Sequence, residues 1–478
     1  MRLGEMTLKN SRMPRVIMLG ACLPLLPMGT ASAQLGGSCL TGAICATPSA
    51  PRSPSPTAVD GKSRQPRGLI SREYYEARAL FEKLWEPGEA SPSGGDGVGP
   101  LYNERSCVGC HFLGGTGGAG DNLKSVTILS VVPGSQAPGG RRPVFQGELE
   151  QLHPGLRNRS SVVLHQHSTK MTDEARLTDI RTYDFIQTRD EIFAIGKSQR
   201  STPALFGAGR IDAIPDKAVI EAEAREFPAF PEIKGRVSRL RGGRIGKFGW
   251  KGQTASLQEF VMAACANELG LEVPGHHQPS LLSANEFDPK KLTLDLSDED
   301  CSRLIRFVAN LPAPVVRPAG DVILGAAVFE AIGCATCHAP SLGAVDGIYS
   351  DLLLHDLGDR FRAFGGGYGS RVTSEIVEKP KSKDAAPPSG EAGPTEWRTT
   401  PLWGVAASAP YLHDGRAPTL DEAIILHGGE AELTSKRYRM LSFFDRQALL
   451  AFLRSQAAPS QPGRPVDRTS HASRDKRN

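Results

Sequence analysis

Two copies of one short motif constrain this chain more than any other feature of its sequence. Residues 107–111 read CVGCH and residues 334–338 read CATCH, so both fit the pattern C-x-x-C-H. On a helical turn, positions i, i+3 and i+4 share one face, which brings two thiols and an imidazole together. This arrangement attaches c-type haem, with the thiols bonded to the vinyl groups and the imidazole bound to iron. The sequence therefore predicts two covalently bound c-type haems.

The motifs assign a role to six side chains. Thioether bonds are predicted for the cysteines and proximal iron ligation for the histidines: Cys107, Cys110 and His111 at haem 1, and Cys334, Cys337 and His338 at haem 2. A redox-active dithiol or a zinc site also uses C-x-x-C, but neither requires a histidine directly after both copies. Aromatic residues make up only 6% of the chain, and two haems would supply apolar volume that its core lacks.

The first 33 residues have the layout of an export signal. Basic residues precede an apolar run over residues 16–28, and Ala31-Ser32-Ala33 then supplies the small residues of a cleavage site. The run is shorter than the ~20 residues that a membrane-spanning helix needs, and no other segment is apolar enough to span a bilayer. We therefore expect a periplasmic protein cleaved near Ala33. A lipoprotein anchored through Cys22 is the alternative.

Charge and periodicity indicate the class of protein. The 478 residues carry 56 Lys+Arg and 52 Asp+Glu, a formal net charge of +4, so a large nucleic-acid surface is not expected. We expect a mainly α fold of two cytochrome c-like haem domains, with a β-containing insertion in the N-terminal domain. The expected divisions are a signal peptide at 1–33, a Ser/Pro-rich linker at 34–69, the haem 1 domain at 70–312, the haem 2 domain at 313–457 and a disordered tail at 458–478.

Capping signals and apolar spacing locate helices on both sides of the motifs. Ser256 with Glu259, and Thr419 with Glu422, are capping boxes that predict helix starts. The helices expected are 72–85, 217–225, 256–269, 297–312, 322–331, 419–427 and 443–455. Runs at 125–132 and 161–167 are rich in β-branched residues and predict strands. No internal repeat is evident beyond the two haem motifs.

Longer phrases resemble the bacterial di-haem cytochrome c peroxidase superfamily, and within it the branch called di-haem oxidoreductase, putative peroxidase. The phrases are TPALFG at 202–207, GRIDAIP at 209–215, GKFGWK at 246–251, YSDLLLHD at 349–356, RTTPLW at 398–403 and YLHDGRA at 411–417. The resemblance covers roughly residues 70–457. It implies an enzyme in which haem 2 receives electrons from a small cytochrome or copper protein and haem 1 reduces peroxide.

The sixth iron ligand decides what each haem does. In the family, the distal ligand of haem 2 is a Met or Tyr on the helix after the H-D-G phrase, and this chain has His427 in that slot. The resemblance therefore implies a His338/His427 pair, with a lower potential than a His/Met pair. A helix-capping role is the alternative for His427. His355 and His413 are rival ligands.

The resemblance also implies an acid–base group beside haem 1, because peroxide cleavage needs a proton. Relatives use a Glu and a Gln there, and neither position is matched in this sequence. Asp212 and His165 are the candidates, although His165 also fits an exposed strand position. Trp250 is expected to lie between the haems and shorten electron transfer, with core packing as the alternative. Relatives hold Ca²⁺ between their haems, and no carboxylate-rich loop here argues for or against it.

Three further points stay open at the level of sequence. The pairs Cys39/Cys45 and Cys265/Cys301 are each able to form a disulfide in an oxidising compartment, and buried free thiols explain the second pair equally well. Two alternative functions also stay open. A pure electron-transfer cytochrome would have protein ligands on both faces of both haems. An oxidase or oxygenase acting on an organic or protein substrate would need an apolar channel to haem 1.

Overall fold

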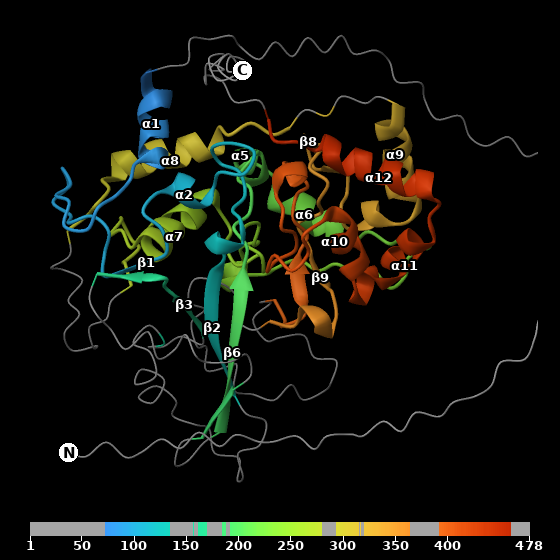
Figure 1. Ribbon diagram of the computed structural model, residues 1–478, viewed down its shortest axis with the longest axis horizontal. Coiled ribbons are helices and arrows are strands. Elements are labelled where there is room, and N and C mark those ends of the chain that lie inside the picture. Colours follow the sequence, from blue (N-terminus) through green and yellow to red (C-terminus); the bar gives the residue numbers. More distant parts are fainter. Residues whose placement is uncertain are drawn as a thin grey trace, which may run out of the picture. The chain divides into compact units, whose positions relative to one another are not determined.

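The computed structural model describes residues 72–133, 161–169, 184–187, 192–279, 293–314, 320–363 and 392–459, with residues 156 and 316. The expected export signal with Cys22, the linker at 34–69, the pair Cys39/Cys45 and nearly all of the expected tail lie outside these ranges. Both haem motifs belong to one compact unit, Ile70–Asn478. Figure 1 shows its elements, whose labels are kept below.

Helical residues outnumber strand residues in the described ranges, as expected for a mainly α protein. The helices are α1 (Arg72–Glu82), α2 (Cys107–Cys110), α5 (Ala208–Asp212), α6 (Asp216–Glu223), α7 (Leu257–Leu269), α8 (Asp298–Ala309), α9 (Gly320–Ala331), α10 (Leu420–Leu426), α11 (Glu432–Met440) and α12 (Phe443–Ser455). All seven helices expected from the sequence are confirmed within a few residues at their ends.

The two capping boxes have the geometry that the sequence predicts. The Ser256 hydroxyl accepts a hydrogen bond from the Glu259 backbone N–H at the start of α7, and Thr419 does the same for Glu422 at the start of α10. α11 was not anticipated, because its polar sequence ELTSKRYRM follows two glycines that look like a helix stop. Its Tyr438 is fully buried, so tertiary packing rather than local propensity holds this helix.

Four strands near the first motif form an antiparallel sheet in the order β3-β2-β6-β5. The strands are β2 (Val126–Pro133), β3 (Ser161–Leu164), β5 (Asp184–Gln187) and β6 (Ile192–Arg200). β2 and β3 confirm the two expected runs. β6 was not anticipated, since its sequence contains Gly196, Lys197 and Arg200, yet it pairs along the whole of β2.

The remaining strands are short. They are β1 (Leu101–Tyr102), β4 (His167–Ser168), β7 (Ser341–Leu342), β8 (Val345–Asp346), β9 (Leu354–Asp356) and β10 (Glu396–Arg398). β9 pairs antiparallel with β10, which joins a segment just after the second motif to one nearer the C-terminus. This pair positions residues of the second haem site.

Two apolar clusters flank the motifs. In Figure 1, α1, α7 and α8 lie around α2, whereas α9 to α12 lie together on the other side. The rings of Phe81 and Phe307 meet between α1 and α8 with centroids 5.2 Å apart, and those of Phe329 and Phe452 meet between α9 and α12 at 5.1 Å. Leu352, from the segment after the second motif, joins the first cluster. The two motif regions therefore share part of one core.

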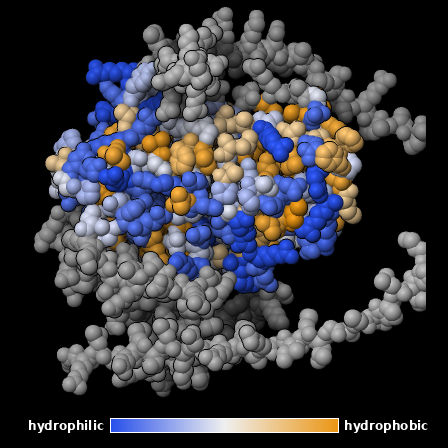
Figure 2. Space-filling view, viewed as in Figure 1, coloured by the Kyte–Doolittle hydropathy of each residue, from blue (hydrophilic) through white to orange (hydrophobic). Residues whose placement is uncertain are grey.

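The C-terminal helices also expose apolar side chains. On the face drawn in Figure 2, hydrophobic atoms lie among hydrophilic ones, and some gather in the region of α9 and α12. Exposed large apolar residues of these helices are Ile323, Leu324, Phe443 and Phe444. No helix in the described ranges is long and apolar enough to cross a membrane.

Candidate haem sites

Each C-x-x-C-H motif lines an internal cavity. The first cavity includes Cys107, Cys110 and His111 in its lining, together with side chains of α7 and α8. The second cavity includes Cys334, Cys337 and His338, together with side chains of α9, α10 and the loop that carries His413. Both linings are dominated by apolar residues, so both suit a largely apolar prosthetic group.

The two proximal histidines are oriented in the same way. His111 Nδ1 lies 3.1 Å from the Gly118 carbonyl oxygen, and His338 Nδ1 lies 3.0 Å from the Tyr349 carbonyl oxygen. A carbonyl only accepts, so Nδ1 donates in each case. Nε2 is then the nitrogen available to iron. Burial lowers the pKa of both imidazoles to about 4, so they are neutral ligands at neutral pH.

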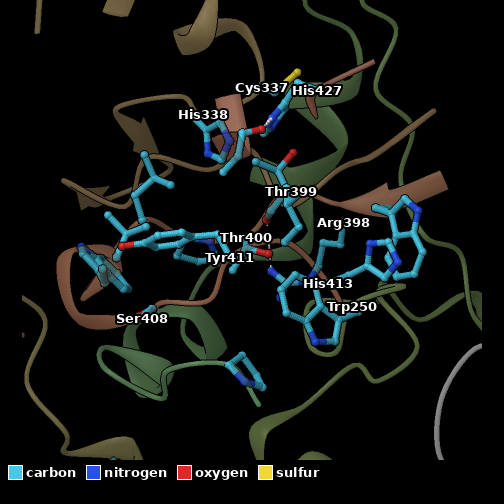
Figure 3. A pocket seen from close by; sticks show the side chains of 18 of the residues that line it. Trp250, Cys337, His338, Arg398, Thr399, Thr400, Ser408, Tyr411, His413 and His427 are labelled. Carbon is cyan, nitrogen blue, oxygen red and sulfur yellow. Dashed lines mark hydrogen bonds between the residues drawn. The ribbon is translucent and has the colours of Figure 1, made fainter. Parts of the chain in front are cut away.

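His427, the expected distal ligand, lies at the end of α10 and lines the same cavity as His338. It donates from Nδ1 to the Ala423 carbonyl oxygen at 2.7 Å. Burial is the main cause of the low pKa of His338, and charge repulsion from His427 lowers it further, so the two rings are close. Figure 3 shows both rings beside Cys337. His427 thus has a fixed tautomer, and Nε2 is the nitrogen that this hydrogen bond leaves unused.

The rival histidines are engaged differently. His355 has carboxylates at both ring nitrogens, Asp351 at 2.9 Å from Nε2 and Glu430 at 2.7 Å from Nδ1. His413 stacks on Trp397, with ring centroids 3.5 Å apart. These contacts make both residues poorer candidates for iron ligation than His427.

Trp250 lies where the two cavities meet. Its indole Nε1–H donates to the Ser201 carbonyl oxygen at 2.8 Å, and the Ser201 N–H donates to the His413 carbonyl oxygen at 2.7 Å. The residues that line both cavities are Ser201, Thr202, Pro203, Leu205, Gly249, Trp250 and Phe260. Figure 3 shows Trp250 close to His413. The Trp250 indole therefore forms part of the wall that the two cavities share.

Buried arginines provide a test of whether haem fits. Arg398 lines the second cavity and donates to the carbonyl oxygens of Gly249 and Thr399, at 2.7 and 3.2 Å. Within the described ranges it has no ion pair with a carboxylate, and burial lowers its pKa to about 10. A buried guanidinium is costly unless an anion balances it. Haem propionates would supply that anion at Arg398. Arg200 lines the first cavity and donates to the Ser198 hydroxyl and the Gln199 carbonyl oxygen.

The motif cysteines do not have the properties of a reactive dithiol. Burial raises the pKa of Cys107, Cys110 and Cys334 to about 12, so these thiols stay protonated at neutral pH. Reactive thiols instead have lowered pKa values. The side chains present therefore fit c-type haem better than a redox-active pair.

The two acid–base candidates lie outside the lining of the first cavity. The Asp212 carboxylate accepts a hydrogen bond from the Leu257 backbone N–H at 2.8 Å, which caps the start of α7. His165 Nε2 lies 2.8 Å from the Asn267 carbonyl oxygen, beyond the cavity wall. The structure does not bring either side chain together with His111.

Two polar side chains that the sequence did not single out do line the first cavity. Glu268 projects from α7, and its Oε2 accepts a hydrogen bond from Asn103 Nδ2 at 2.6 Å. Gln253 lies in the preceding turn, where its Oε1 accepts from the Lys251 N–H at 3.0 Å. A Glu and a Gln are the residue types that relatives use beside haem 1.

A signal for Glu268 was present in the sequence. It continues a helical stripe formed by Val261, Ala264 and Cys265, all of which line the first cavity. A carboxylate on the apolar stripe of a helix indicates either a buried partner or a functional site. The stripe was recognisable by its spacing, but only the structure shows that it faces a cavity.

The structure also corrects the expectation that no further repeat exists. Residues 248–259 read FGWKGQTASLQE and residues 411–422 read YLHDGRAPTLDE. Each segment forms a turn closed by one β-bridge, Phe248–Thr254 and Tyr411–Ala417, followed by a capped helix. The segments RSTP at 200–203 and RTTP at 398–401 also correspond. Few residues are identical between the two segments, so the repeat is recognised from their shared backbone geometry.

Cys265 and Cys301 are buried free thiols, not a disulfide. Burial raises the pKa of Cys301 to about 12 and also raises the pKa of Cys265. In the described ranges, no group of three or more His, Cys, Asp or Glu side chains is placed to hold a metal ion.

Comparisons with known proteins agree with the haem assignment in one part of the chain. Residues 382–456 match the family model described as di-haem oxidoreductase, putative peroxidase, which confirms the resemblance noted from the sequence. The match spans the loop of His413 and α10 but neither C-x-x-C-H motif. No curated protein matches the chain.

Solved structures show only distant similarity. Hydrazine synthase from Kuenenia stuttgartiensis is 20% identical, with a TM-score of 0.30, covering 54% of this chain and 72% of that one. A MauG-like protein associated with microbial copper homeostasis is 17% identical, with a TM-score of 0.28, covering 54% of this chain and 78% of that one.

Proposed function

We propose that this chain, which carries the di-haem oxidoreductase match in its C-terminal part, is a periplasmic di-haem c-type cytochrome with peroxidase activity. The first cavity would be the peroxide site and the second an electron-transfer site. A small cytochrome or copper protein is the electron donor that the family resemblance implies. The main support is a difference between the two cavities at one equivalent position of the repeat.

That position is His427 in the second cavity and Ala264 in the first. In the repeat, each lies the same number of residues after its helix cap, Thr419 or Ser256, and each lines its own cavity. An imidazole there supplies a second strong iron ligand, whereas a methyl group supplies none. The first cavity therefore has room for a small ligand where the second has a protein ligand.

When bound, the two haems supply electron transfer and peroxide reduction. His111 and His338 would hold the irons through Nε2, because the hydrogen bond from each Nδ1 to a backbone carbonyl keeps the ring in one tautomer. Glu268, oriented by Asn103, can hold the proton that peroxide cleavage needs and deliver it to the leaving oxygen. Trp250 lies in the wall between the sites, so its indole shortens the path for an electron.

The proposal is tested by adding an iron ligand to the first cavity in one variant and removing the ligand from the second cavity in another. We expect the holoprotein to show one high-spin and one low-spin haem by optical and EPR spectroscopy, with only the high-spin signal altered by peroxide. Ala264→His should convert the high-spin haem to low-spin and abolish peroxide reduction. His427→Ala should perturb only the low-spin haem.

Ala263→His is the matched control, because Ala263 is on α7 but outside the cavity lining. It should leave both signals unchanged. Two low-spin signals that ignore peroxide in both redox states would contradict the proposal and leave an electron-transfer cytochrome.

A further inference from the structure

A buried charged cluster, of which His355 lines the second cavity, has no role in the function proposed above. His355 lies on β9 and is 3% exposed, and Asp351 is 2% exposed. Glu430, whose side chain is 16% exposed, approaches from the turn between α10 and α11. The imidazole lies between the two carboxylates, with one at each ring nitrogen.

The carboxylate at each ring nitrogen determines the protonation state of His355. A carboxylate only accepts hydrogen bonds, so a ring with one at each nitrogen donates from both and is an imidazolium. Burial alone lowers the pKa of His355, but the Cys337 sulfur and the Asp351 carboxylate outweigh it and hold the pKa well above its ordinary value. A thioether sulfur carries no charge, so with haem attached the two carboxylates would be the groups that balance the imidazolium.

The cluster contacts the second haem motif directly. His355 Nδ1, which donates to Glu430, also lies 3.5 Å from Cys337 Sγ, so the charged ring is in contact with the sulfur. The Asp351 backbone N–H donates to the Cys337 carbonyl oxygen at 3.0 Å. The carboxylate of Glu430 also accepts from the backbone N–H groups of Lys234 and Asp356. The three charged groups are therefore fixed relative to the sulfur that would bond to the haem.

We propose that the cluster of His355, Asp351 and Glu430 sets the reduction potential of the haem held by the second motif. His355 is a positioning residue here, because it acts through the Cys337 sulfur and does not bind iron. The inference rests on the proposed function for haem at that motif and for the assignment of the low-spin signal to it. Hydrogen bonds and burial around the ligands are established means of tuning such potentials.

The proposal predicts shifts of opposite sign. Ferric haem carries one more positive charge than ferrous haem, so a more negative surrounding favours the ferric form and lowers the potential. Removing the imidazolium in His355→Gln leaves two carboxylates without their cation, so the potential should fall. Removing one anion in Glu430→Gln keeps an acceptor for the same donors, so the potential should rise.

The experiment is a spectroelectrochemical titration of the holoprotein, in which the low-spin and high-spin haems are followed separately. At a fixed applied potential, each variant should change the ferric-to-ferrous ratio of the low-spin haem about tenfold, which for one electron is about 59 mV. The high-spin haem should shift much less and serves as an internal reference. His277→Gln is the matched control, since His277 also bonds a carboxylate, Glu272, but lies outside both cavities.

Unchanged potentials in both variants, or shifts of the same sign, would overturn the proposal. If His355→Gln fails to fold, Glu430→Gln decides alone, and the absence of an upward shift is then sufficient to reject it. The proposed function is judged separately by the spin states and the reaction with peroxide. A pair of low-spin haems would reject peroxidase activity while leaving these potential shifts measurable.

Discussion

The histidines around the two cavities differ in what their ring nitrogens already contact. His111, His338 and His427 each donate from Nδ1 to a backbone carbonyl, which presents Nε2 to the cavity. His355 uses both nitrogens for carboxylates, and His413 is held by stacking. At the scale of one residue, the hydrogen bonds of His111, His338 and His427 leave Nε2 unused, whereas those of His355 use both nitrogens.

The indole of Trp250 should matter for electron transfer more than for stability. Trp250→Phe keeps an aromatic ring but loses the hydrogen bond to Ser201, which should cost about 1 kcal/mol of unfolding free energy. Trp397→Phe is the control, because Trp397 also donates one hydrogen bond, to Phe361, but lines only the second cavity. Stopped-flow kinetics should show slower electron transfer between the haems in the first variant only. Equal rates in both variants would argue for a packing role.

The carboxylate of Glu268 should control peroxide turnover. Glu268→Gln keeps the size of the side chain and the contact with Asn103 but removes a group that can exchange a proton, so kcat/KM for peroxide should fall by about 10²- to 10⁴-fold. Glu259→Gln, on the same helix but paired with Arg244 outside the cavity, should retain activity. A Glu268→Gln enzyme with full activity would leave the proton source unassigned.

At the scale of elements, α7 and α10 are two versions of one unit. Each follows a turn closed by a β-bridge, begins at a hydroxyl cap, and lines a cavity with one face. The start of α7 has a second hydrogen-bond acceptor, because the Asp212 carboxylate accepts a hydrogen bond from the Leu257 N–H. Helix starts leave backbone N–H groups without intrahelical partners, so such acceptors stabilise the helix and fix its position.

The location of Asp212 predicts a structural effect on mutation. Asp212→Ala should lower the unfolding free energy by about 1 kcal/mol, the usual effect of losing a helix cap, without reducing peroxide turnover in the folded enzyme. Asp212→Asn retains an acceptor oxygen and should lose less stability. Denaturant titration and steady-state kinetics on the same samples would separate the two effects. A large loss of turnover at unchanged stability would instead favour the acid–base role that the sequence suggested.

At the scale of the whole molecule, the segment after the second motif contributes to the core around the first. Leu342, Ile348 and Leu352 belong to the same buried apolar cluster as residues of α1, α7 and α8. Trp403, from the segment before the His413 loop, packs there too. Because these contacts join distant parts of the chain, changes near one cavity should affect the stability of the whole unit.

Stability should depend on pH through two buried histidines that shift in opposite directions. Burial, with the charges of Arg200, Arg416 and Lys251, lowers the pKa of His413 to about 2. As pH falls below about 6.5, the unfolded chain binds a proton at this position and the folded protein does not, so stability decreases by about 1.4 kcal/mol per pH unit.

For His355 the sign is reversed. Its pKa is raised in the folded protein, so its stabilising effect is full below about pH 6.5 and is lost as pH rises through the folded pKa. Denaturant unfolding of the holoprotein between pH 5 and 8 should therefore show a shallower acid slope for His413→Gln than for the wild type. His355→Gln should have a shallower alkaline slope. Parallel curves for all three proteins would contradict both assignments.

The sequence by itself determined the features that depend on residues close together in the chain. The C-x-x-C-H spacing, the caps at Ser256 and Thr419, and the helix that carries His427 are local, so residue type and spacing were sufficient to predict them. The same local reasoning favoured Asp212 and missed Glu268, because a carboxylate that caps a helix and one that faces a cavity look alike in a sequence.

Only the tertiary structure decided which side chains meet across long stretches of chain. It brings Trp250 into the wall shared by both cavities and places Ala264 and His427 at equivalent positions. It also surrounds His355 with Asp351 and Glu430. These relations depend on the packing of segments far apart in the sequence, where the burial of each group and the charge beside it are fixed by the fold and not by its neighbours in the chain.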